Sequence, residues 1–281
     1  HTRKILQPSF YSRDKTMYRL TWAALVLLLA SCSSGGSAKF SNAPKQDKAP
    51  ANGLLAHCTE VASESSYCTA LVSDTMSRPA LIGLDSGRVC LADQQFQYDL
   101  SHSSSLALDG DALYTCRCSE NITQINLTTG RRLDIFVGCT GIAVDDGQPI
   151  VYHPQDSEQQ LRRYDSFDAL IGGLPPQVLP GGLPVESIAA HKGVLYGAWH
   201  SADRIQRLPI GQDVPGEIVL ENYDDWIRGL DVLENGTLVV VKGIAGQELA
   251  FFDAATGRHL RDLPLALDPR YVVAGIQCAS N

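Results

Sequence analysis

The 281-residue sequence is poor in positive charge: 23 Lys and Arg residues stand against 31 Asp and Glu residues, giving a formal net charge of −8. Binding to nucleic acid or to an anionic membrane surface depends on clustered positive charge, so neither is expected. The sequence also lacks a Gly-x-Ser-x-Gly elbow, a phosphate loop and a dinucleotide fingerprint. It therefore names no reaction, and the catalytic residues and any cofactor are unknown from the sequence.

Metal-binding signatures are scarce as well. The seven histidines form no short ligand spacing, and Cys116-x-Cys118 lacks the usual Cys-x-x-Cys separation. Cys116 and Cys118 stand two apart on an expected strand, so they point to one face and favour disulfides with neighbouring strands. We expect no metal site.

No apolar run is long enough to cross a bilayer. The longest, over residues 20–30, falls well short of the roughly 20 residues that a membrane-spanning helix needs. It ends in Leu29-Ala-Ser-Cys32, which resembles the bacterial lipobox, in which the cysteine is lipidated and becomes the first mature residue. The resemblance implies an anchor at Cys32, in the outer membrane if the source is Gram-negative because Ser33 follows.

These features divide the chain into four parts. Residues 1–16 are expected to be an upstream extension outside the natural product, and residues 17–31 a lipoprotein signal peptide. Residues 32–52, rich in Ser, Gly, Ala, Pro and Lys, are expected to form a flexible tether. Residues 53–281 are expected to form the folded domain, since the sequence as a whole is 44% hydrophobic and 19% charged, as folded proteins are.

An internal repeat predicts the fold. Strand, turn and strand recur with spacings of 36 to 46 residues, the length of a four-stranded propeller blade. The equivalent positions are Ala107, Ala143, Ala189, Asp231 and Ala274. On the inner strands small residues alternate with bulky ones, so the bulky face of one blade can pack on the small face of its neighbour.

A second motif supports the same repeat. Asn126-Leu-Thr-Thr-Gly-Arg131 and Asp253-Ala-Ala-Thr-Gly-Arg258 are near copies that mark a later hairpin, and Asp165-Ser-Phe-Asp168 occupies the corresponding place in another repeat. Here the chain resembles bacterial propellers with NHL, YVTN or quinoprotein-like repeats. The resemblance implies an all-β propeller of four-stranded antiparallel blades.

The blade count follows from the chain ends. The strand at residues 271–276 has no hairpin after it, and the strands from residue 67 onward lack an inner strand. We expect the C-terminal strand to complete that blade and close a five-bladed ring, with Cys278 near Cys68 or Cys58. A sixth blade that uses residues 53–66 is the alternative.

The candidate site lies where the inner strands begin. Three residues before each equivalent position stand polar side chains that packing does not dictate, and they would surround one mouth of the channel. The proposed ligand-binding residues are Glu186, Arg228, Tyr271 and Thr140 at these positions, with Trp226 and His102 at the rim beside them. Arg228 is expected to be an exposed charge. The alternative is that these residues only bond neighbouring loops around a water-filled pore.

Two functions fit this site. The favoured one is a monomeric, lipid-anchored binding module of the cell envelope, whose partner is an envelope protein, a peptide or a small sugar-like ligand. The alternative is a metal-dependent hydrolase that resembles lactonase and gluconolactonase propellers, with Glu186 and Asp231 near the expected metal position. A quinoprotein is excluded because three tryptophans cannot supply a stacked tryptophan pattern.

Overall fold

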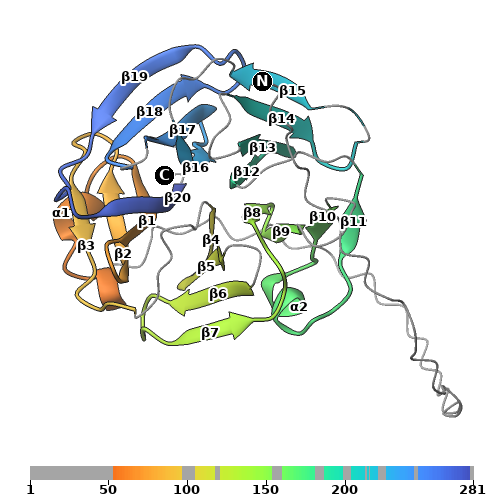
Figure 1. Ribbon diagram of the computed structural model, residues 1–281, viewed down its shortest axis with the longest axis horizontal. Coiled ribbons are helices and arrows are strands. Elements are labelled where there is room, and N and C mark those ends of the chain that lie inside the picture. The colour runs from red at the N-terminus through yellow and green to blue at the C-terminus, as the bar shows by residue number, and fades with distance from the viewer. Residues whose placement is uncertain are drawn as a thin grey trace, which may run out of the picture. The chain divides into compact units, whose positions relative to one another are not determined.

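The computed structural model describes residues 53–96, 105–117, 121–153, 160–180, 187–198, 204–212, 214, 216–220, 226–243 and 246–278. In these residues the strands form five four-stranded antiparallel sheets, arranged as a ring around a common axis (Figure 1). The predicted five-bladed propeller is confirmed. The described helices are short: η1 (Gly53–Leu55), α1 (Thr59–Ala62) and α2 (Phe167–Ile171).

Each blade is named here by its strands from the axis outward. Blade 1 consists of β20 (Val272–Cys278), β1 (Tyr67–Ser73), β2 (Ser77–Gly83) and β3 (Val89–Leu91). Blade 2 consists of β4 (Leu106–Asp109), β5 (Ala112–Arg117), β6 (Asn121–Asn126) and β7 (Arg132–Ile135). Blade 3 consists of β8 (Gly141–Asp145), β9 (Gln148–His153), β10 (Gln160–Arg163) and β11 (Gln177–Leu179). Blade 4 consists of β12 (Ser187–His191), β13 (Val194–Ala198), β14 (Ile205–Pro209) and β15 (Glu217–Leu220). Blade 5 consists of β16 (Ile227–Val232), β17 (Thr237–Lys242), β18 (Glu248–Asp253) and β19 (His259–Pro264).

The blades pack through the alternation seen in the sequence. Ala107 of blade 2 shares a core cluster with Ile142 of blade 3, and Ala189 of blade 4 shares one with Leu230 of blade 5. All four residues are buried. Successive side chains of a strand point to opposite faces, so the inner strands of blades 1 to 4 present alanine to one neighbour and a large aliphatic residue to the other. This allows five sheets to meet near a crowded axis.

The ring is closed by the two ends of the domain. Strand β20 pairs antiparallel with β1, and Cys68 stands directly opposite Cys278 and forms a disulfide with it. One of the two disulfide partners expected for Cys278 is thereby confirmed. The alternative of a sixth blade is wrong, because the described residues ahead of β1 form η1 and α1 instead of strands.

The second sequence motif is a tight turn fixed by its first side chain. Asp253 Oδ1 accepts hydrogen bonds from the backbone N–H and the hydroxyl of Thr256 at 2.9 and 2.8 Å. Asn126 Oδ1 makes the same two bonds to Thr129, each at 2.7 Å. A short polar side chain that bonds the backbone ahead of it is a common turn device.

The glycine of this turn also brings neighbouring blades together. Gly257 has φ +70°, and a Cβ placed on it would lie 1.8 Å from Val219 O in blade 4. Gly87 of blade 1 also has φ +70°, and its Cβ would lie 2.3 Å from Pro264 O in blade 5. The turn therefore needs glycine twice, for its left-handed backbone and for the close approach of the next blade.

Blade 3 departs from this pattern and corrects one sequence expectation. The segment at Asp165 was expected to be a hairpin turn, but it leads into α2. Ser166 Oγ accepts the N–H of Ala169 at 3.1 Å and so caps the helix. The segment lacks the turn glycine, and Phe167 stacks on Tyr114 of blade 2 with ring centroids 4.2 Å apart.

Opening the ring is expected to cost more stability than opening a smaller loop. Cys68 and Cys278 are 210 residues apart, whereas the disulfide partners Cys58 and Cys90 are 32 apart. In the chain-entropy model, Cys68→Ala/Cys278→Ala lowers the free energy of unfolding by about 5 kcal/mol and the Cys58→Ala/Cys90→Ala control by about 3.5 kcal/mol. Urea unfolding measures both variants. A smaller loss in the first variant would contradict ring closure by this bond.

The close approach at Gly257 gives a second expectation. In Gly257→Ala the added methyl group is unfavourable in the left-handed backbone conformation and also overlaps with Val219. We therefore expect the variant to lose about 2–4 kcal/mol of unfolding free energy. Gly236→Ala is a matched control, since Gly236 has φ +80° but open space around the added methyl. It should lose only about 1 kcal/mol. Equal losses in thermal or urea unfolding would show that the turn does not help dock the blades.

Candidate functional site

The structure describes four of the six residues expected at the channel mouth. Thr140 precedes β8, Trp226 and Arg228 lie at the start of β16, and Tyr271 precedes β20. Because the blades repeat one strand order around the axis, the starts of the inner strands lie on one face of the ring (Figure 1). We call these four residues the channel mouth, after the prediction that they surround one end of the channel. The expected site residues His102 and Glu186, and the lipidation residue Cys32, lie outside the described residues.

Arg228 is half-buried, which corrects the expectation of an exposed charge. Burial lowers the pKa of its guanidinium. Gly246, in the β17–β18 loop, lies beside its stem: a Cβ on Gly246 would come 3.2 Å from Arg228 Cδ and 2.7 Å from Val273 O. Gly246 therefore approaches both β16 and β20 closely.

Tyr271 belongs to the core more than to an open mouth. Its side chain is only 8% exposed and shares a cluster with Leu265 and Val273 between blades 5 and 1. The guanidinium groups of Arg78 and Arg270 lie 5.8 and 5.4 Å from its ring centroid. An aromatic ring at a position that is polar in other repeats can pack into the interface between blades. The alternation of small and large residues along the strand does not show whether such a ring is exposed or buried.

Thr140 and Trp226 differ in exposure. The Thr140 Oγ1 atom is buried and has no hydrogen-bond partner among the described residues. Trp226 is 43% exposed, which is high for an indole. A buried hydroxyl without a partner is costly, so a ligand atom that reached this buried position would be favourable.

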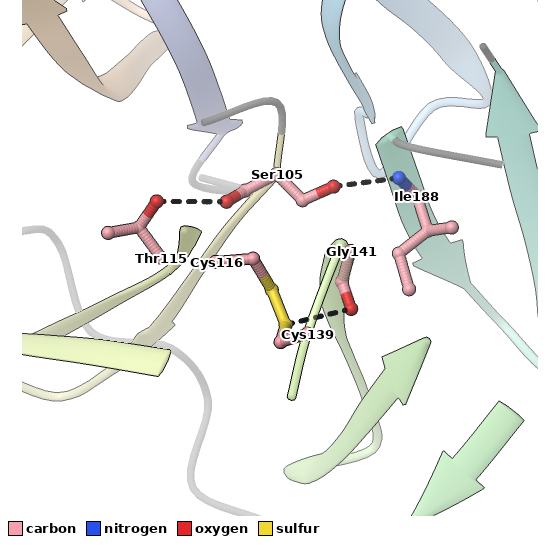
Figure 2. The surroundings of a disulfide bond; sticks show 6 residues. All are labelled: Ser105, Thr115, Cys116, Cys139, Gly141 and Ile188. Atoms are coloured by element: carbon pink, nitrogen blue, oxygen red, sulfur yellow. Dashed lines mark hydrogen bonds between the residues drawn. A yellow bond between two sulfur atoms is a disulfide. The ribbon is translucent and has the colours of Figure 1, made fainter. Parts of the chain in front are cut away.

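A disulfide braces the segment that carries Thr140. Cys139, immediately before it, is bonded to Cys116 of β5. Figure 2 shows this bond together with Gly141, whose carbonyl oxygen lies 3.4 Å from Cys139 Sγ. The covalent link to blade 2 restricts the backbone on one side of Thr140, and β8 restricts it on the other.

Directly inside the mouth, the inner strands bond across the axis. Ser105 Oγ accepts the N–H of Ile188 at 2.8 Å, although blade 3 lies between their blades (Figure 2). The Ser105 carbonyl in turn accepts the hydroxyl of Thr115 at 3.4 Å. Ser105 is buried. The bond links blades 2 and 4 close to the starts of their inner strands.

Asp231 is the exception among the equivalent positions, where the other four blades have alanine. Its side chain turns toward β20: Oδ2 accepts the N–H of Cys278 at 2.5 Å and Nε2 of Gln277 at 2.9 Å. Burial raises the pKa of Asp231 to about 7, although hydrogen bonds from Cys278 and Val232 oppose the shift. The carboxyl group thus fastens the C-terminal strand, and it is neither an open metal ligand nor a partner of Arg228.

The described residues carry three disulfides, which place the protein in an oxidising compartment outside the cytosol. Within the described part of the chain, no helix is both long enough and apolar enough to cross a bilayer.

No family model matches the chain, and no curated protein does. Its fold is similar to that of several solved propellers. A chain from the crystal structure of a nidogen/laminin complex is 14% identical, with 76% of this chain and 86% of that chain covered and a TM-score of 0.47. PorZ of Porphyromonas gingivalis, a surface component of the type-IX secretion system, is 13% identical over 74% of this chain and 28% of its own, with a TM-score of 0.42. YCF48 bound to the D1 peptide is 10% identical over 72% and 68%, with a TM-score of 0.38. These likenesses are too distant to indicate a function.

The raised pKa of Asp231 predicts a pH dependence of stability. Between the ordinary value of 3.8 and about 7, the folded state keeps a proton that the unfolded state has released. Unfolding then releases a proton, so rising pH destabilises the fold by up to about 1.4 kcal/mol per pH unit. The contribution is complete below pH 4 and lost above pH 7.

The difference in urea-unfolding free energy between wild type and Asp231→Asn isolates this group, because the other carboxyls are common to both. We expect the difference to shift in favour of the variant as pH rises from 4 to 7. A constant difference over that range would show that Asp231 ionises normally.

Proposed function

We propose that this protein is a binding module of the cell envelope, anchored through lipidated Cys32, whose channel mouth takes a small polar ligand. The ligand is a sugar-like molecule or the exposed end of a peptide or envelope protein. The lipobox-like segment supports the anchor, and the disulfides support an extracytoplasmic location. The outer membrane is the proposed address in a Gram-negative source, because Ser33 follows Cys32.

The observation that carries this proposal is the combination of groups at the mouth. Arg228 supplies a partly desolvated cation, Thr140 a hydroxyl without a partner among the described residues, and Trp226 an exposed indole. An indole packs against the apolar face of a sugar or peptide, while the cation and the hydroxyl bind its polar edge. His102 and Glu186 are proposed to complete the rim.

The frame around the mouth favours binding because it is held in place beforehand. Thr140 follows a disulfide-bonded cysteine, Arg228 lies against the Gly246 loop, and the Ser105 bond joins the strands beneath them. A site whose backbone is already fixed spends less conformational entropy when a ligand binds. Binding is also favoured over hydrolysis, since the Asp231 carboxyl is engaged with β20.

Tryptophan fluorescence tests the proposal with soluble peptidoglycan fragments as the probe, since these carry both sugar and peptide groups. In a mature Trp199→Phe protein, Trp226 is the remaining tryptophan, because Trp22 falls in the predicted signal peptide. We expect saturable quenching. Arg228→Gln, which keeps most of the stem, should weaken binding about tenfold or more through loss of a charged hydrogen bond.

Arg132→Gln is the matched control, because Arg132 lies on the outer strand β7 and pairs with Asp134 at 2.7 Å. It should bind as the parent does. Absence of saturable quenching, or equal weakening in both variants, would count against a ligand site at the mouth.

A further inference from the structure

A cluster of metal-ligating side chains lies away from the channel mouth, at the outer side of blade 1. His57 and Cys58 stand just before α1, and Cys90 lies on β3. They line a surface hollow of about 460 Å³ together with Glu60 and Arg88. In the structure Cys58 and Cys90 form a disulfide.

The three side chains are already close enough to share one ion. Their ligand atoms all lie within 4.8 Å of one another, and His57 Nε2 is 3.7 Å from Cys58 Sγ. Two ligands of a tetrahedral Zn²⁺, bound at about 2.0–2.3 Å, stand roughly 3.5–3.8 Å apart. His57 Nε2 also lies 2.9 Å from the Leu91 carbonyl oxygen, to which it donates a hydrogen bond. Metal binding therefore replaces this hydrogen bond with a bond to the ion, and the two sulfur atoms must separate.

This disulfide is more accessible than the other two in the described residues. Cys68, Cys278, Cys116, Cys139 and Cys58 are buried, whereas Cys90 is partly exposed and faces the hollow. Thiol–disulfide exchange begins with attack on a reachable sulfur atom, so Cys90 is the sulfur that a reductant meets first.

We propose that reduction of the Cys58–Cys90 disulfide creates a Zn²⁺ site made of both cysteine sulfurs and His57 Nε2. A dithiol reductant transfers two electrons and two protons to the disulfide, which becomes two thiols while the reductant becomes a disulfide. Zn²⁺ then displaces the two thiol protons to solvent and takes water as its fourth ligand. The two thiolates neutralise the ion.

The surroundings suit both steps. Arg88 and Glu60 both line the hollow and form an ion pair at 2.9 Å, so together they bring no net charge to repel either the thiolates or the ion. The backbone that carries the ligands is held independently of the disulfide, because Leu55 and Val61 are buried in one core cluster with Leu81. The fold thus keeps His57 and Cys58 near β3 after the sulfur bond opens.

Selective reduction is the first measurement. The mature protein, with Cys32→Ser and Cys118→Ser so that thiols come only from the three disulfides, is treated with dilute dithiothreitol and desalted without oxygen. We expect alkylation and peptide mapping to find free thiols at Cys58 and Cys90 while the other two disulfides are retained. Earlier opening of either buried disulfide would overturn the proposal.

Metal binding is the second measurement, with Co²⁺ as a spectroscopic probe and Zn²⁺ as competitor. The selectively reduced protein should bind one equivalent of Co²⁺ with sulfur-to-metal charge-transfer absorption, which Zn²⁺ abolishes, and the oxidised protein should show none. His57→Ala should weaken Co²⁺ binding about tenfold or more. His57→Asn serves the same purpose if the alanine variant folds poorly.

His259→Ala is the matched control, because His259 is also exposed but pairs with Asp262 on blade 5 at 2.9 Å. It should bind Co²⁺ as the parent does. A reduced protein without the charge-transfer band, or with a band that His57 variants leave unchanged, would overturn the site.

Discussion

The antiparallel pairing of β20 with β1 is the interaction on which the rest of the molecule depends. Blades 2 to 5 are each built from consecutive strands, whereas blade 1 needs β20 to complete β1, β2 and β3. The pairing closes the ring and leaves no open edge on β1. The Cys68–Cys278 disulfide lies on this pairing, and Asp231 binds the same end of β20 from blade 5. The strand pairing, the disulfide and the Asp231 hydrogen bond therefore all hold β20 in place. Release of β20 would expose the buried faces of both blade 1 and blade 5.

At Asp231, close packing of the neighbouring blade is given up for a hydrogen bond that helps close the ring. At the four equivalent positions alanine lets the neighbouring blade approach, and a carboxyl group there must be desolvated. The compensation is a hydrogen-bond acceptor for the N–H of Cys278, which is where the last strand leaves the ladder of blade 1. The polar exception thus occurs at the interface where the ring closes, where a strand end needs a partner.

Local sequence patterns predicted the strands and turns of the blades. The burial of individual side chains depends on contacts between distant parts of the chain, which these patterns do not contain. The hairpins and the Asp253 turn were readable because their hydrogen bonds lie within a few residues. Tyr271 and Arg228 share a repeat position with Thr140, yet their burial depends on Arg78 and Gly246, which come from other parts of the chain. His57 and Cys90 are separated by 33 positions and meet only because α1 packs on blade 1, so no ligand spacing marks them. Equivalence in a repeat fixes where a backbone lies but not what covers its side chain.

The three disulfides differ in what their opening would do to the frame. Cys68–Cys278 and Cys116–Cys139 lie in the interior and join strands that carry the ring or the channel mouth. Cys58–Cys90 joins a short helix to an outer strand, and the apolar contacts of α1 duplicate its mechanical role. Opening this reachable bond lowers the free energy of unfolding by about 3.5 kcal/mol in the chain-entropy model, but the apolar contacts remain to hold α1 on the blade. Burial of the first two disulfides and exposure of the third thus separate the cysteines that must stay oxidised from those that are free to take part in chemistry.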